Sequence, residues 1–150
     1  MLKPIPANIP AELQQLPQWV VWKRTIRDGK PTKPPFRVDG SHASSTDPST
    51  WIDFTTARRA AERFDGIGFV LTQADPFAAL DFDNCRCPAF DNLHPGIAGG
   101  LDMVLPGIAD HIRRMHSYTE ISPSGKGIRV IVKGRISSSG AKKGAIEAYQ

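Results

Sequence analysis

The stretch Ala78-Ala79-Leu80-Asp81-Phe82-Asp83-Asn84 is an apolar run that ends in two acidic residues. A short apolar run of this kind predicts a buried strand. Because alternate side chains of a strand share a face, Asp81 and Asp83 are expected on one face while Leu80 and Phe82 point into the core. Two neighbouring carboxylates repel each other, and a cation between them relieves the repulsion. The stretch therefore predicts a Mg²⁺ or Mn²⁺ site or, in the plainer interpretation, two solvated aspartates at a strand end.

Apolar patterning around this stretch predicts a chain dominated by strands. Strands are expected at residues 19–22, 67–71, 78–82, 119–122, 127–133 and 145–149, with 67–71 and 78–82 as adjacent strands. Helices are expected at residues 53–64, capped by Asp53 or Thr55, and at 101–115, in one or two pieces broken at Pro106-Gly107. A helical turn is expected around 11–16, and a loop or hairpin over 23–50. The pattern favours an α+β or α/β class.

The composition is that of an ordinary globular protein and excludes several other classes. The 150 residues are 40% hydrophobic and 23% charged, with a net charge of +4. No run approaches the roughly 18–20 apolar residues of a membrane span, and the N-terminus lacks the pattern of a signal peptide. We therefore expect a cytoplasmic protein with a single domain over residues 1–150. The two cysteines, Cys85 and Cys87, fit neither a disulfide framework nor a zinc site.

Positive charge is concentrated between residues 113 and 143. Glu120 is the only acidic residue in this segment. Its basic residues are Arg113, Arg114, Lys126, Arg129, Lys133, Arg135, Lys142 and Lys143. Such a segment favours a ligand that carries phosphate, although a solvated basic face is the simpler alternative.

The stretch Ser122-Pro123-Ser124-Gly125-Lys126-Gly127-Ile128-Arg129 has the composition of a phosphate-binding turn. Its glycines allow backbone N–H groups to approach phosphate oxygens, and Lys126 and Arg129 supply positive charge. It is not a Walker A loop, because Gly127 follows the lysine and a β-rich segment follows Gly127. An ordinary hairpin turn with charged residues is the alternative.

A third acidic residue lies in the last predicted strand, at Glu147 among apolar neighbours. A single glutamate in a strand is more often a surface charge than a metal ligand. Beside Asp81 and Asp83, however, Glu147 would complete the carboxylate set of a two-metal polymerase site.

Taken together, these stretches resemble the bifunctional primase-polymerase domain of phages, plasmids and mobile elements, a branch of the archaeo-eukaryotic primase superfamily. The resemblance covers nearly the whole chain, and its specificity comes from the order and spacing of its motifs. They are Gln18-Trp19-Val20-Val21-Trp22, Gly29-Lys30-Pro31-Thr32-Lys33-Pro34-Pro35, Ala43-Ser44-Ser45-Thr46-Asp47-Pro48-Ser49-Thr50-Trp51, Gly66-Ile67-Gly68-Phe69-Val70-Leu71, Leu80-Asp81-Phe82-Asp83-Asn84-Cys85 and Tyr118-Thr119-Glu120-Ile121-Ser122-Pro123-Ser124-Gly125-Lys126-Gly127.

The resemblance implies an α+β catalytic core with a central, mostly antiparallel sheet and flanking helices. It implies a DNA primase and polymerase that acts by a two-metal mechanism, with Mg²⁺ or Mn²⁺ as cofactor. DNA template and primer, nucleoside triphosphates and a helicase domain or protein are the implied partners. The implied metal ligands are Asp81, Asp83 and Glu147; the implied nucleotide-binding residues are Ser122, Ser124, Gly125, Lys126, Gly127 and Arg129; Lys30 and Lys33 are candidates for nucleic-acid contact.

Two departures from the family pattern stand out. Many relatives have a histidine where this chain has Arg129, and an arginine keeps the positive charge but does not shuttle protons near neutral pH. The family also continues beyond its third acidic motif, so we expect the chain to continue past Gln150 in the natural protein. The alternatives are a catalytically silent nucleic-acid-binding replication module with the same fold and, less favoured, a metal-dependent nuclease.

Overall fold

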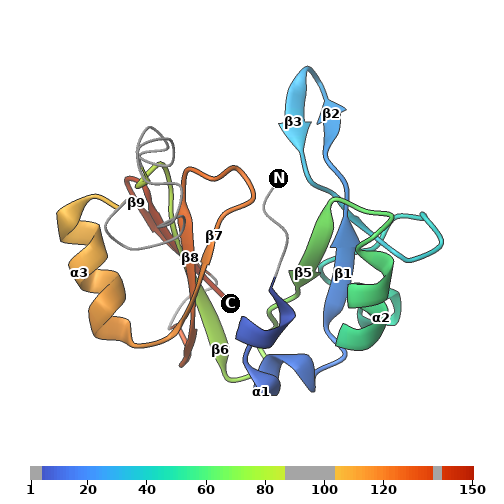
Figure 1. The fold of residues 1–150 in the computed structure, drawn as a ribbon, viewed down its shortest axis with the longest axis horizontal. Coiled ribbons are helices and arrows are strands. Elements are labelled where there is room, and N and C mark those ends of the chain that lie inside the picture. The colour runs from blue at the N-terminus through green and yellow to red at the C-terminus, as the bar shows by residue number, and fades with distance from the viewer. Residues whose placement is uncertain (1–4, 87–103, 137–139) are drawn as a thin grey trace. The chain divides into compact units, whose positions relative to one another are not determined.

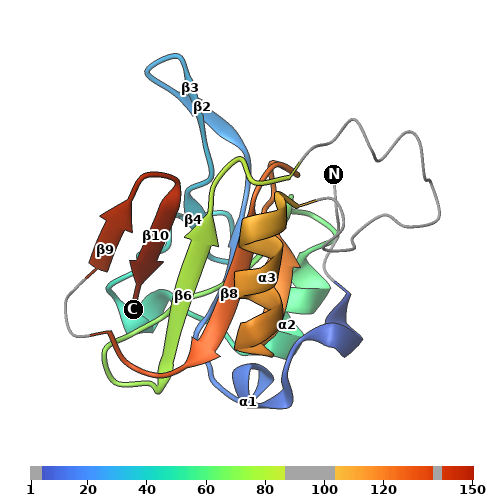
Figure 2. The ribbon, with the colours of Figure 1, turned by 90° about the vertical axis from the view of Figure 1, so that its left-hand side faces the viewer.

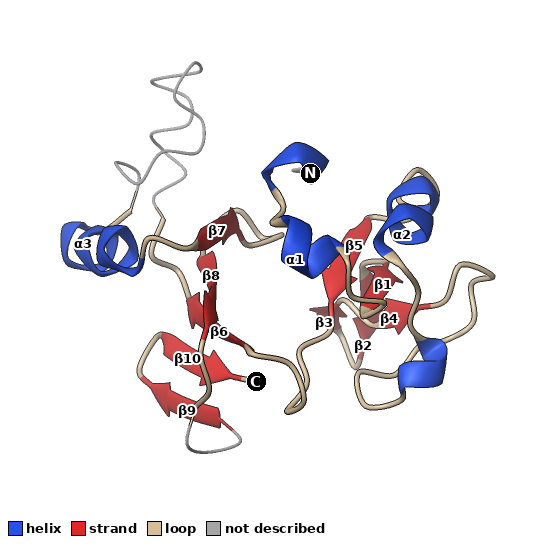
Figure 3. Cartoon of the chain, turned by 90° about the horizontal axis from the view of Figure 1, so that it is seen from below, coloured by secondary structure: helices blue, strands red, loops and turns tan. Residues whose placement is uncertain are grey.

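The computed structural model describes residues 5–86, 104–136 and 140–150 (Figure 1). The chain divides into two compact units, Met1–Val70 and Leu71–Gln150. Every strand pair in the described residues is antiparallel, and the helices are few and short (Figure 3). The predicted α+β class with antiparallel sheets is therefore confirmed.

The first unit is built on a three-stranded sheet in which β1 (Trp19–Trp22) lies between β4 (Pro35–Phe36) and β5 (Gly66–Phe69) (Figure 3). A separate hairpin of β2 and β3 follows β1. The remaining elements are η1 (Pro6–Asn8), α1 (Ala11–Gln14), β2 (Thr25–Arg27), β3 (Lys30–Thr32), η2 (Pro48–Thr50) and α2 (Phe54–Ala60). The strand predicted at 19–22 and the hairpin expected within 23–50 are both present.

Trp19 is the centre of the first unit's core. Its side chain is buried, and its ring lies 4.9 Å from the ring of Phe54 and 5.2 Å from that of Phe69. Its indole N–H donates to the Leu13 carbonyl at 3.0 Å, so the polar atom of the ring does not lose its hydrogen bond on burial. The next residues of β1, Val20 and Val21, are also buried, as expected for a strand with both faces covered.

Helix α2 begins one residue after Asp53, as predicted. The Asp53 carboxylate accepts hydrogen bonds from the N–H of Thr56 at 2.9 Å and from its hydroxyl at 2.6 Å. These hydrogen bonds hold the pKa of Asp53 below its usual value. We expect Asp53→Ala to lower the free energy of unfolding by about 1 kcal/mol. Urea unfolding followed by tryptophan fluorescence measures this, because all three tryptophans lie in the first unit.

The Asp53 cap also makes a prediction about pH. Because its folded pKa is depressed, its contribution is present above the unfolded pKa and is lost as the pH falls through the folded value. The difference between wild type and Asp53→Ala should therefore shrink between about pH 5 and about pH 3. Glu62→Ala, at an exposed position just beyond α2, is the control and should change stability by less than about 0.5 kcal/mol. Equal unfolding midpoints for Asp53→Ala and wild type near neutral pH would contradict the prediction.

The second unit is a five-stranded sheet in the order β7-β8-β6-β10-β9 (Figure 2). Strand β6 (Phe77–Phe82), which carries Asp81, lies in the middle and pairs with β8 and β10. The other elements are α3 (Pro106–Met115), β7 (Tyr118–Ile121), β8 (Ile128–Lys133), β9 (Gly140–Lys143) and β10 (Ile146–Tyr149). The helix begins at Pro106 rather than breaking there, because proline suits the first helical position, where its missing N–H costs nothing.

One face of this sheet packs into a core that includes α3 residues. Phe82, Ile128 and Val130 of the sheet are buried with Ala109 and Ile112 of α3. Leu80 is half-buried against the same cluster, so Leu80 and Phe82 point into the core as predicted. Asp81, which alternates with them, therefore belongs to the opposite face of the sheet.

Two features of the sheets differ from the sequence prediction. The strands predicted at 67–71 and 78–82 are not neighbours, because β5 pairs with β1 while β6 pairs with β8 and β10. Strand β9 was not predicted, since Gly140–Lys143 is exposed throughout and shows no apolar pattern.

The part of the 101–115 prediction that precedes Val104 lies outside the described residues. None of the helices in the described parts of the chain is long and apolar enough to cross a membrane.

Candidate functional site

A row of charged side chains crosses the second unit's sheet from edge to edge. The register places Asp81 directly opposite Arg129 on one side and Glu147 on the other. Arg129 is in turn opposite Glu120, and Glu147 is opposite Lys142. Directly opposite residues of an antiparallel pair project from the same face, with Cβ atoms about 4.5–5.5 Å apart. The five side chains therefore form one continuous row, here called the charged row: Glu120, Arg129, Asp81, Glu147 and Lys142.

The strongest contact in the charged row is a two-pronged pair between Arg129 and Asp81. Arg129 Nε donates to Asp81 Oδ1 at 2.8 Å, and Nη2 donates to Oδ2 at 3.0 Å. Parallel hydrogen bonds of this kind are the geometry that the guanidinium fork favours with carboxylates. The Asp81 side chain is 24% exposed and that of Arg129 37%. The pair is thus partly buried but still in contact with solvent.

Two tyrosines flank the charged row, two residues along from Glu120 and Glu147 on their strands. The Tyr149 hydroxyl donates to Asp81 Oδ2 at 3.1 Å, and the Arg129 guanidinium lies 5.6 Å from the centre of the Tyr149 ring. The Tyr118 hydroxyl donates to Glu120 Oε2 at 3.1 Å. Each tyrosine therefore hydrogen-bonds one carboxylate of the charged row.

Burial and neighbouring charges shift the pKa values of these groups. Burial raises the pKa of Tyr149 and of Tyr118, and the neighbouring carboxylates raise both further. Burial also raises the pKa of Glu120, although Arg129 and the Tyr118 hydroxyl act against that rise. For Arg129, burial acts to lower the pKa, but the hydrogen bonds to Asp81 together with the electrostatic interactions with Tyr149, Asp81 and Glu120 outweigh it, and the pKa is raised. Arg129 is consequently a permanent cation within the charged row.

The far end of the charged row is more open. Lys142 Nζ lies 3.5 Å from Glu147 Oε2, and their side chains are 60% and 46% exposed. An exposed pair of this kind contributes about 0–1 kcal/mol because water and salt screen it. Glu147 is therefore held only loosely, and its carboxylate is open to other partners.

Asp83 lies just beyond the end of β6 in an exposed turn. Its N–H donates to the Ala145 carbonyl at 2.8 Å, which continues the pairing of β6 with β10 by one step. The structure thus brings Asp81 and Glu147 together on adjacent strands and places Asp83 at the end of the same pair of strands.

The chemical type of these donors fits a divalent cation. Hard cations prefer oxygen ligands, and a group of three carboxylates supplies them. Both Asp81 oxygens, however, already accept hydrogen bonds from Arg129. Among residues 5–86, 104–136 and 140–150, no group of three or more histidine, cysteine, aspartate or glutamate side chains is arranged to hold a metal. A cation at Asp81 would therefore have to share this carboxylate with Arg129 or displace it.

The predicted phosphate-binding turn is a hairpin turn between β7 and β8. The N–H of Ser122 donates to the Gly127 carbonyl at 2.9 Å, and the N–H of Gly125 donates to the Ser122 carbonyl at 2.8 Å. The Ser122 hydroxyl accepts from the N–H of Gly127 at 3.0 Å and lies 2.9 Å from the Ser124 hydroxyl. The two hydroxyls thus brace the turn from within, while the Lys126 side chain is exposed.

Arg86 stabilises this turn through two hydrogen bonds, a role that the sequence did not reveal. It is buried, and its Nη1 donates to the Gly125 carbonyl at 2.6 Å. Its backbone N–H donates to the Lys126 carbonyl at 2.9 Å. Arg86 lies between Cys85 and Cys87, where the sequence raised only the question of a zinc site. Cys85 is buried and its thiol donates to the Phe82 carbonyl at 3.2 Å, whereas Cys87 lies outside the described residues.

Gly127 is required where the turn passes β6. A Cβ atom at this position would lie 2.8 Å from the Phe82 carbonyl oxygen and 3.2 Å from the Ser122 hydroxyl. Because the nearest atom belongs to the backbone, relief needs a shift of the strand. We expect Gly127→Ala to destabilise the second unit by about 1–3 kcal/mol. Tyrosine near-ultraviolet circular dichroism monitors this, because both tyrosines lie in the second unit.

Gly107 offers a matched control for that prediction. It lies in the first turn of α3, and a Cβ atom there would meet nothing within 4 Å. Gly107→Ala should therefore leave stability unchanged or raise it by up to about 1 kcal/mol. If both alanine variants unfold at the same urea concentration, the close approach at Gly127 has no energetic consequence.

The lysines predicted to contact nucleic acid belong to the first unit. Lys30 begins β3 and pairs with Arg27 across the β2–β3 hairpin, and Lys33 follows β3 directly. Sequence reasoning missed the ties of Tyr118, Glu120 and Tyr149 to the charged row. A strand alternation of Tyr118 with Glu120 and of Glu147 with Tyr149 was visible, but nothing in the sequence gave the register that joins them.

The resemblance to primase-polymerases led us to expect an antiparallel α+β fold, and the second unit has one, with Asp81 on its central strand. No protein-family model matches the chain. The chain is 37% identical over 134 residues to a protein of Nitratiruptor phage NrS-1 named DNA primase-polymerase. The match covers 86% of this chain and 17% of that protein, so the chain spans less than a fifth of its relative's length. The resemblance to a phage primase-polymerase is thereby confirmed.

Proposed function

We propose that this chain is part of a DNA primase-polymerase that joins nucleotides on a DNA template. The observation that carries the proposal is the charged row, in which Asp81 and Glu147 lie directly opposite each other on adjacent strands. It is supported by the 37% identity to the phage relative. DNA template and primer and nucleoside triphosphates are the proposed substrates.

Asp81, Asp83 and Glu147 are the proposed ligands of Mg²⁺ or Mn²⁺. In phosphoryl transfer such cations supply positive charge where negative charge develops. Asp81 and Glu147 support this role by their direct pairing, and Asp83 by continuing the same strand pair through its N–H. The loose contact of Glu147 with Lys142 leaves its carboxylate accessible.

The turn between β7 and β8 is the proposed binding site of the triphosphate. Lys126 projects from it into solvent, and Ser122, Ser124, Gly125 and Gly127 fix its backbone. Arg129 lies two residues after Gly127 in the sequence. Its guanidinium would reach a phosphate by leaving Asp81. Nucleotide binding and the release of Asp81 would then be a single event.

Template-directed incorporation of labelled nucleotide tests the proposal. The 150-residue chain and a version extended at its C-terminus should be assayed on a primed template with Mn²⁺ or Mg²⁺. Template-dependent product from either version is the expected result. DNA binding by both versions without any incorporation would instead indicate a catalytically silent nucleic-acid-binding module.

A further inference from the structure

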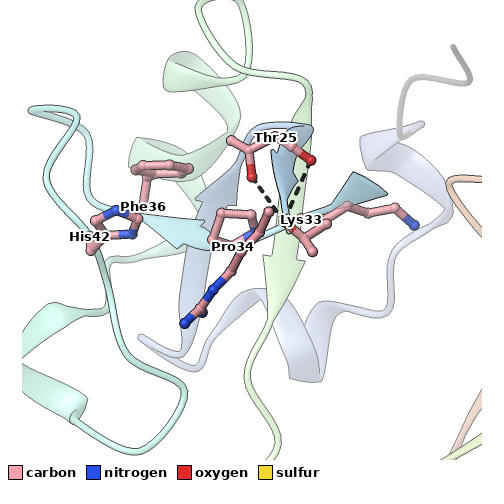
Figure 4. A pocket seen from close by; sticks show the side chains of 7 residues that line it. Thr25, Lys33, Pro34, Phe36 and His42 are labelled. Atoms are coloured by element: carbon pink, nitrogen blue, oxygen red, sulfur yellow. Dashed lines mark hydrogen bonds between the residues drawn. The ribbon is translucent and has the colours of Figure 1, made fainter. Parts of the chain in front are cut away.

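An open pocket beside the β2–β3 hairpin is separate from the charged row and belongs to the first unit. Its volume is about 600 Å³, within the range of roughly 300–1,000 Å³ of small-molecule sites. The residues that line it are Thr25, Arg27, Thr32, Lys33, Pro34, Phe36 and His42 (Figure 4). Of these described residues, two are permanent cations and none is acidic, so the pocket favours an anionic ligand.

The pocket contains a stacked pair of rings. The centres of Phe36 and His42 lie 4.8 Å apart, with 27° between the ring planes (Figure 4). Phe36 is half-buried and belongs to β4, which pairs with β1, so this ring of the stack is anchored to the sheet. His42 is exposed although Phe36 covers one of its faces. A nucleobase would stack on the face of the ring turned away from Phe36, since aromatic side chains are surfaces on which nucleobases stack.

The cations are placed for a chain of phosphates. Arg27 lines the pocket and pairs with Lys30 across the hairpin. The ammonium of Lys33 extends away from the stacked rings (Figure 4). It lies 6.0 Å from the centre of the Trp22 ring, so it would meet a phosphate beside the nucleotide on His42 rather than that nucleotide itself. The hydroxyls of Thr25 and Thr32 lie 2.9 Å apart and tie the two strands together at the base of the hairpin.

We infer that this pocket binds single-stranded nucleic acid, with one unpaired base stacked on His42 and the adjoining phosphates on Arg27 and Lys33. A basic loop alone attracts phosphate without regard to bases, whereas a ring with an open face adds binding that depends on the base. The inference rests on the proposed function, because it names where the same chain holds an unpaired template segment.

The test compares two fluorescent oligonucleotides of about 12 residues, oligodeoxythymidylate and an abasic strand with the same phosphates. Fluorescence anisotropy should show the intact chain binding the thymidylate strand about tenfold more tightly. His42→Ala should abolish that preference while leaving the affinity for the abasic strand unchanged, and His42→Phe should restore it. Arg27→Gln should weaken both complexes and reduce the slope of log affinity against log salt by about 0.7.

Arg58→Gln is the matched control, because Arg58 is exposed on α2 and does not line the pocket. It should change neither affinity by more than about twofold. An unchanged base preference in His42→Ala, or an equal loss on both strands, would overturn the inference. Base-dependent binding by a chain that incorporates no nucleotide would refute the proposed function alone, whereas incorporation with unaltered His42→Ala binding would refute the pocket alone.

Discussion

Replacing Asp81 by asparagine is expected to reduce template-directed incorporation by more than about a hundredfold, since even outer-shell partners of a metal contribute 10–100-fold. The substitution preserves the size of the side chain and removes its charge. Arg129 would keep one acceptor at this position and retain Glu120, whose Oε1 lies 3.8 Å from Arg129 Nη1. The fold should therefore persist while cation binding fails, and near-ultraviolet circular dichroism of the tyrosines checks that it does.

Asp110→Asn is the matched control for Asp81→Asn. Asp110 is exposed on α3 and pairs with Arg113 at 3.0 Å, on the helix that packs against the other face of the sheet. Its replacement should leave incorporation within about twofold of wild type, because surface substitutions away from a site have small effects. Similar activity in the Asp81→Asn and Asp110→Asn proteins would remove Asp81 from the proposed site.

Replacing Arg129 by glutamine is expected to lower the stability of the second unit and to strengthen its binding of Mn²⁺. Without the guanidinium, Asp81 and Glu120 lose the cation that they share, and Asp81 keeps Glu147 as its acidic neighbour across the strand pair, so the carboxylates repel one another. Because the pair is partly exposed, we expect a loss of about 1–2 kcal/mol in the free energy of unfolding. Mn²⁺ should restore more stability to this variant than to wild type, since Asp81 no longer has to leave Arg129.

Thermal unfolding at increasing Mn²⁺ concentration, followed by the tyrosine signal, measures this linkage. A ligand at a hundred times its dissociation constant stabilises the folded state by about 2.7 kcal/mol, so a difference in metal affinity becomes visible. Arg129→Lys retains the charge but not the fork, and it should fall between wild type and Arg129→Gln. Identical Mn²⁺ responses in all three proteins would mean that Arg129 does not compete with the metal for Asp81.

The alternation of apolar residues was enough to predict most strands and the core face of β6. Leu80 and Phe82 had to point away from Asp81, and they do. The partnership of Asp81 with Arg129 was not predictable, because it depends on the register between strands 48 residues apart in the chain. The sequence placed both residues at the same site by resemblance but assigned Arg129 to phosphate alone.

Other features escaped prediction because their causes are tertiary. β9 consists of exposed residues that pair with β10 without a hydrophobic pattern of their own. The buried Arg86 stabilises the turn because its side chain donates to the carbonyl of Gly125, which is 39 residues away in the sequence. The two units are separate because β5 pairs with β1, whereas β6 pairs with β8 and β10. The sequence of a short apolar strand does not by itself determine which strand it pairs with.

The order of strands in the second unit has a consequence for biosynthesis. β6 is synthesised before both of its partner strands, and its second edge is completed by β10, which ends at Tyr149. Asp81 therefore lacks Glu147 and Tyr149 until the chain has been synthesised 68 residues further, to Tyr149, and until then one edge of β6 is unpaired. Pairings this distant along the chain slow folding, so the charged row is expected to assemble late in the folding of the second unit.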